Sequence, residues 1–150
     1  GGLFLAGVVM AAAIALHNLP EGMVIGASYA ADLAEAGEDG RMMALVIGLH
    51  NIPEGMAVAV PLAAGGASRG RAVLTTAVAG APTVLGAVLG FCLGTMGPGL
   101  QMLTLGGASG AMLYVVFGEL LPESFRLCRS PAPVMAAVLG VLTGMGVVLG

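Results

Sequence analysis

Long apolar stretches, separated by short polar or Gly/Pro-rich breaks, are the feature that most restricts how this chain can fold. Each of five stretches is long enough to meet the roughly 17–25 residues that an α-helix needs to cross a bilayer. They cover residues 3–31, 42–64, 72–96, 100–121 and 133–150. We therefore predict an all-α fold, a polytopic membrane helix bundle with five transmembrane helices.

The composition supports a bilayer as the natural solvent. Of the 150 residues, 58% are hydrophobic and 9% are charged, whereas soluble domains carry about 25% charged residues. This leaves too little polar surface to cover a water-soluble particle. The five basic residues are all arginines and form no basic patch, which excludes a nucleic-acid partner.

The arginines also predict an orientation. Short connections make neighbouring spans antiparallel, so the second and fourth breaks face the same side of the membrane. These two breaks hold Arg69, Arg71, Arg126 and Arg129, and only Arg41 lies in the first. Because positive loops favour the cytoplasm, we expect a multi-pass protein of a plasma or inner membrane with an extracytoplasmic C-terminus.

Glycines recur at four-residue spacing in two of the spans. Gly86, Gly90 and Gly94 form one such stripe, and Gly106 and Gly110 form another. Small residues at this spacing let helices approach closely in lipid. We interpret both stripes as packing surfaces.

A seven-residue motif occurs twice, at residues 17–23 and 50–56. The sequence is His-Asn-Leu-Pro-Glu-Gly-Met in the first copy, and Ile replaces Leu in the second. The two copies contain the only histidines of the chain, and each lies near the middle of its span. A repeat of this length at matched depth indicates a shared role.

The spacing within each copy places its polar groups together on a helix. His and Glu are four residues apart and therefore share one face. The proline between them cannot donate the backbone hydrogen bond of a regular helix, so we expect both of these helices to be kinked. Backbone carbonyl groups that lose their helical hydrogen bond at membrane depth are tolerated where protein or a water-filled cavity surrounds them.

Because the two spans are consecutive and antiparallel, the motifs can face each other at the bilayer midplane. Burying two carboxylates there costs several kcal/mol, and a divalent cation between them offsets that cost. Ligands of this kind suit zinc, iron or manganese better than Cu(I). The alternative, two kink sites that bind nothing, leaves the matched His and Glu unexplained. The predicted metal ligands are His17, Asn18, Glu21, His50, Asn51 and Glu54.

The paired motifs resemble those on the fourth and fifth helices of the ZIP (Zrt-, Irt-like protein) family of divalent metal transporters. The five spans are similar to helices four to eight of that family. This resemblance implies that residues 1–150 are a single transmembrane domain, incomplete at its N-terminus. It also implies a primary site of His17, Glu21, His50 and Glu54, next to a second site with Asn18 and Asn51 in which the two glutamates bridge both metals.

The chain departs from the family pattern on its third span. Members often carry Glu before Pro there, as a ligand of the second site, and the matching dipeptide here is Ala81-Pro82. We therefore expect one strong metal site, or a weak second one. We also expect a glutamate placed at Ala81 to strengthen the second site.

The function expected from the resemblance is transport of Zn²⁺, or of Fe²⁺, Mn²⁺ or Cd²⁺, into the cytoplasm. One alternative is a non-transporting metal-binding membrane subunit or sensor. Another is an intramembrane metalloenzyme, but there is no His-Glu-X-X-His motif and no spare general base beside the site, so we expect no enzyme. The expected partners are the metal ion, the lipid bilayer, and either a second copy of the chain or the missing N-terminal helices.

Overall fold

The computed structural model describes residues 2–35 and 37–149, without the side chains of residues 34, 35, 119, 120, 123, 127 and 147–149. The described residues are helical apart from short connections, as the sequence predicts. The helices are α1 (Gly2–Glu35), α2 (Asp39–Ala64), α3 (Arg69–Thr95), α4 (Pro98–Val115), the π-helical segment η1 (Val116–Leu120), α5 (Leu121–Leu127) and α6 (Ala132–Leu149).

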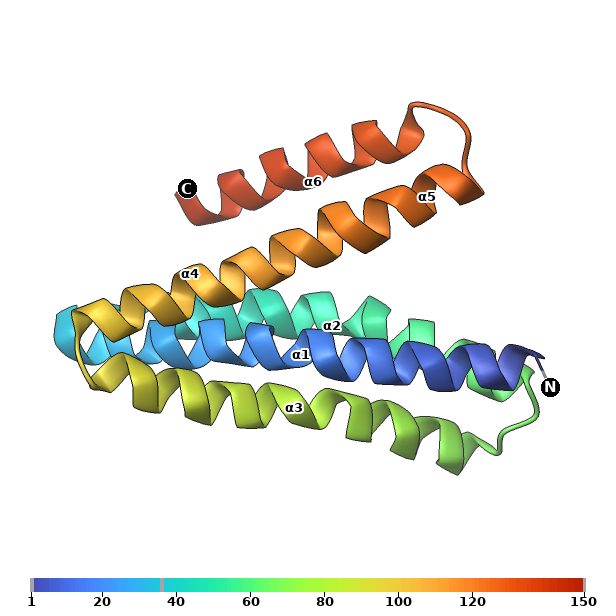
Figure 1. Cartoon of the computed structure of the whole chain (residues 1–150), viewed down its shortest axis with the longest axis horizontal. Helices are drawn as coiled ribbons and strands as arrows, with labels where there is room; N and C mark the ends of the chain where they lie inside the picture. The colour runs from blue at the N-terminus through green and yellow to red at the C-terminus, as the bar shows by residue number, and fades with distance from the viewer. Residues whose placement is uncertain (1, 36, 150) are drawn as a thin grey trace. The chain divides into compact units, whose positions relative to one another are not determined.

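The chain divides into two compact units, Gly1–Met112 and Leu113–Gly150. In the first unit, α1 lies between α2 and α3 and packs against both (Figure 1). In the second, α5 packs against η1 and α6. The single transmembrane domain expected from the sequence stays a prediction.

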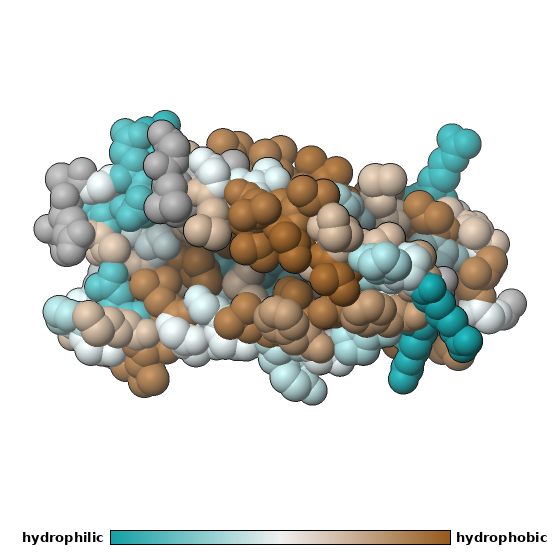
Figure 2. All heavy atoms as spheres, turned by 90° about the horizontal axis from the view of Figure 1, so that it is seen from above, coloured by the Kyte–Doolittle hydropathy of each residue, from teal (hydrophilic) through white to brown (hydrophobic). Residues whose placement is uncertain are grey.

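Four helical stretches are long and apolar enough to cross a membrane. They are Gly2–Leu33, Asp39–Ala64, Arg69–Thr95 and Pro98–Gly118. The described apolar part of α6, Ala132–Gly146, is shorter, so the fifth span stays a prediction. Large apolar side chains such as Leu16, Leu49 and Val84 are exposed. Figure 2 shows many hydrophobic residues, drawn in brown, on the surface of the helices.

The connection between the first two helices is shorter than the predicted break at residues 32–41. Helix α1 continues to Glu35 and α2 begins at Asp39, because alanine and glutamate favour helix over loop. The Asp32 carboxylate accepts hydrogen bonds from the backbone nitrogens of Asp39 (3.0 Å) and Gly40 (2.9 Å). It therefore satisfies two amides at the start of α2 that lack helical partners.

Prolines lie inside several helices of the chain. Helix α1 runs through Pro20 and α2 through Pro53, both without interruption. The kinks expected at these two residues stay a prediction. The helical run from α4 likewise continues through Pro122 to Leu127, past the predicted end of the fourth span at residue 121.

Helices α1 and α3 meet backbone against backbone. At four glycines an added Cβ would lie too close to a carbonyl oxygen of the other helix: Gly22 with Thr83, Gly26 with Ala87, Gly86 with Leu19, and Gly90 with Met23. Such close approach is the use that small residues serve between membrane helices. Gly86, Gly90 and Gly94 are all buried, which confirms the first predicted packing stripe.

The second predicted stripe does not pack in this way. At Gly106 and at Gly110 of α4, an added Cβ would meet nothing within 4 Å. Four-residue spacing of glycines permits a close helix contact without requiring one.

We predict that Gly86→Val lowers the thermal stability of the protein in detergent, because the new side chain would push α3 off the backbone of α1. Overpacking usually costs about 1–3 kcal/mol. The matched control is Gly48→Val in the middle of α2, where an added Cβ meets nothing within 4 Å. Circular dichroism melts measure both, and equal melting temperatures for the two variants would contradict the close α1–α3 contact.

Candidate metal centre

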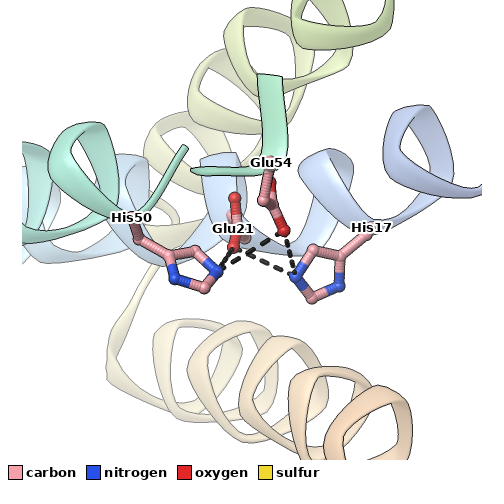
Figure 3. A group of neighbouring side chains, drawn as sticks. All are labelled: His17, Glu21, His50 and Glu54. Atoms are coloured by element: carbon pink, nitrogen blue, oxygen red, sulfur yellow. Dashed lines mark ion pairs between the residues drawn. The ribbon is translucent and has the colours of Figure 1, made fainter. Parts of the chain in front are cut away.

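Four side chains from the two motif copies converge on one point (Figure 3). His17 and Glu21 come from α1, and His50 and Glu54 come from α2. Each offers one ligand atom, and the four atoms all lie within 4.8 Å of one another. The structure therefore brings together the four residues predicted for a primary site.

Each imidazole lies close to both carboxylates. His17 Nε2 is 3.1 Å from Glu21 Oε1 and 3.4 Å from Glu54 Oε1. His50 Nε2 is 3.4 Å from Glu21 Oε1 and 3.5 Å from Glu54 Oε1. The nitrogen and oxygen atoms thus alternate around a common centre, and neither helix holds a complete set alone.

These separations match the size of a zinc coordination sphere. Ligands at about 2.0–2.2 Å from zinc in a tetrahedron lie roughly 3.3–3.6 Å from one another. The four His–Glu distances fall in or just below that range, and the separations among the four ligand atoms extend to 4.8 Å, wider than in a regular tetrahedron. The buried Glu21 Oε1 also has no hydrogen-bond partner, although both imidazole Nε2 atoms lie within 3.4 Å of it. Its lone pairs are therefore available to a cation.

Burial makes the charge of this cluster costly. The Glu21 side chain is fully buried, and the Glu54 side chain is 18% exposed. Two carboxylates at this depth repel each other and have lost their hydration. A divalent cation bound by two neutral imidazoles and both carboxylates would balance the charge and satisfy all four groups.

The two asparagines of the motifs have different surroundings. Asn18 is 2% exposed, and its Nδ2 donates to the carbonyl oxygen of Ala79 in α3 at 2.9 Å, while its Oδ1 has no partner. Asn51, with its amide turned to suit its neighbours, donates to Glu21 Oε2 (2.9 Å) and to the carbonyl of Ile47 (3.2 Å). One asparagine therefore joins α1 to α3, and the other orients a carboxylate of the cluster.

A small pocket of about 80 Å³ adjoins the cluster. Both asparagines and Glu54 line it, together with Thr76 and Gly80 of α3. Sequence reasoning missed Thr76 and Gly80, since neither belongs to a motif. Their four-residue spacing, which puts both on one face of a helix, is the only signal that could have drawn attention to them.

Comparison with known proteins agrees with the geometry. The model of the ZIP zinc transporter family matches residues 1–150. The chain belongs to the ZIP zinc transporter family.

One relative in this family is the zinc transporter GufA of Myxococcus xanthus, which is 40% identical over 114 residues. The match covers 76% of this chain and 44% of the relative, so the chain spans less than half of that protein. No solved structure matches the chain significantly.

The structure corrects one expectation drawn from the ZIP resemblance. Ala81 does not line the pocket beside the cluster; it lies on an exposed face of α3. The cause is the rotation of α3, which docks on α1 through a face that includes Ala79. Residue 81 is about 200° further round the helix from residue 79. A glutamate at Ala81 is therefore not expected to reach a second site of this ZIP chain.

We predict that Glu21→Gln and Glu54→Gln each weaken Zn²⁺ binding by about a hundredfold or more. Leaving one partner of a buried charge cluster unbalanced costs about 3–5 kcal/mol. Asn18→Ala should weaken binding less, because an amide does not neutralise the ion. Calorimetric titration in detergent measures the three affinities, with Glu38→Gln at an exposed acid as the control. Equal losses for all three site variants would contradict this division of roles.

Proposed function

We propose that the chain carries Zn²⁺, or a similar divalent cation, across a membrane into the cytoplasm through the cluster of His17, Glu21, His50 and Glu54. The observation that carries this proposal is the convergence of the buried Glu21 carboxylate, the partly buried Glu54 carboxylate and two imidazoles at distances that fit one ion. Membership of a family of zinc transporters supports cargo binding over a permanent structural metal.

Placement of this site at the bilayer midplane is part of the proposal. Residues 17–21 lie near the middle of α1, and residues 50–54 lie near the middle of α2. Metal sites near the midplane, on helices interrupted by glycine or proline, are typical of carriers with alternating access. The expected kinks at Pro20 and Pro53 are part of this proposal, because a less regular backbone beside the site would make it easier for the metal ion to bind and leave.

The proposed orientation follows from the arginines. Arg69 and Arg71 open α3, and Arg126 and Arg129 lie at or after the end of α5. If α3 and the run from α4 to α5 each cross the membrane once, these four share one side, which the positive-inside rule assigns to the cytoplasm. Eighteen helical residues, about 27 Å at 1.5 Å each, give α6 nearly the length of a bilayer core. The C-terminus would then be extracytoplasmic.

The cargo is proposed as Zn²⁺ first, because nitrogen and carboxylate ligands in a compact set of four suit it. Fe²⁺, Mn²⁺ and Cd²⁺ remain candidate cargoes of the same ligands. The relative described as a zinc transporter agrees with this choice. A homodimer is not supported by these observations and is not proposed.

We predict that the purified protein in liposomes admits Zn²⁺ to an enclosed zinc-sensitive dye, and that Glu21→Gln reduces this flux to the level of protein-free liposomes. Glu38→Gln, which removes an exposed acid, should leave the flux unchanged. Tight Zn²⁺ binding without flux would overturn the transport proposal and favour a non-transporting subunit or sensor.

We also predict which loops face outward. In a background of Cys92→Ser and Cys128→Ser, an impermeant maleimide should label Glu38→Cys on intact cells, whereas Gly70→Cys should need permeabilised cells. Both positions are exposed, and they flank α2 at opposite ends. The reverse labelling pattern would show that the proposed orientation is wrong.

A further inference from the structure

The pocket of about 80 Å³ beside the cluster differs from it in charge. Its volume is sufficient to admit water, since a cavity needs only about 10–15 Å³ of such space to hold one molecule. Glu54 is its one ionisable lining residue, and this carboxylate already belongs to the cluster. The other polar groups are the amides of Asn18 and Asn51 and the hydroxyl of Thr76, which are neutral.

These neutral groups are only partly free to hold an ion. Asn18 Oδ1 is buried without a partner, so it can accept a bond from water or contact a cation. Thr76 Oγ1 donates to the carbonyl of Ala72 at 2.9 Å and keeps its lone pairs. Asn51 is engaged with Glu21. The pocket thus offers oxygen atoms but little negative charge of its own.

A second divalent cation in this pocket would raise a charge problem. Two such ions carry four positive charges against the two carboxylates of Glu21 and Glu54. A net charge of about +2 in a low-dielectric interior is strongly unfavourable. A third carboxylate would be needed to hold both ions tightly.

Gly80 is the position on α3 from which a third carboxylate could enter. It lines the pocket one turn from Thr76, and a Cβ added there would meet nothing within 4 Å. A side chain at residue 80 would therefore meet no steric obstacle at its Cβ. Ala81, the next residue, is exposed on another face.

We propose that Gly80 determines how many cations the chain holds: the absence of an acid there keeps the adjoining pocket a neutral, hydrated compartment beside a single tight site. This inference rests on the proposed function, because it takes the four-residue cluster as the site of the cargo. It assigns a specificity-determining role to a residue that carries no side chain.

The test compares Zn²⁺ stoichiometry after desalting for the wild-type protein and three variants in detergent. We expect one ion per chain for wild type, two for Gly80→Asp, one for Gly80→Asn and one for Ala81→Asp. Gly80→Asn has nearly the same size as Gly80→Asp and separates charge from space. Ala81→Asp adds the same charge on the exposed face.

A wild-type protein that holds two ions, a folded Gly80→Asp protein that holds one, or two ions in Ala81→Asp would each overturn the inference. A wild-type protein that holds none would instead overturn the proposed function. A Mn²⁺ titration of the wild type alone, followed by electron paramagnetic resonance, keeps the test decisive if Gly80→Asp does not fold. It should show only isolated ions, and the spectrum of a coupled Mn²⁺ pair would contradict the proposal.

Discussion

The side chain of Glu21 is fully buried on α1, and the Glu54 carboxylate of α2 lies in the same cluster, within an envelope of apolar helices. Two negative charges so placed repel each other and have exchanged water for a medium that solvates them poorly. The neighbouring polar side chains partly offset this cost through their contacts with the carboxylates. Both imidazoles approach both carboxylates, and Asn51 donates to the remaining oxygen of Glu21. A divalent cation would balance this charge, and we therefore propose that the chemistry of the site follows from the cost of burying Glu21.

The motif copies are nearly identical in sequence, yet the fold makes them unequal. His17 is 11% exposed and His50 is 53% exposed. Asn18 bonds to the backbone of α3, whereas Asn51 bonds within the cluster. The reason is that α1 lies between α2 and α3, and glycine contacts bring α3 against the backbone of α1. The copy on α1 is therefore enclosed, and the copy on α2 keeps an open side.

The sequence alone was sufficient to predict a helical fold and the meeting of the four candidate ligand residues. His and Glu four apart on consecutive antiparallel spans leave few other arrangements. It was not sufficient to predict the rotation of α3. Ala81 and Gly80 differ by one position, and only the docking of the face with Ala79, Gly86 and Gly90 decides which residue lines the pocket. The hydrogen bonds from the start of α2 to the Asp32 carboxylate could not be predicted either. An aspartate near a loop is usually solvated, and only the structure shows that two backbone amides lie next to this one.

The three contacts of α1 lie at different heights along its length. Asp32 holds the start of α2 near one end, Asn18 reaches α3 near the middle, and Gly22 and Gly26 bring α3 close between them. A helix restrained at several levels cannot easily slide or rotate alone. A motion that exposes the cluster first to one side and then to the other, if it preserves these bonds, must displace α1, α2 and α3 as one rigid body. In the proposed transport, the metal would then move together with its ligands instead of passing between them.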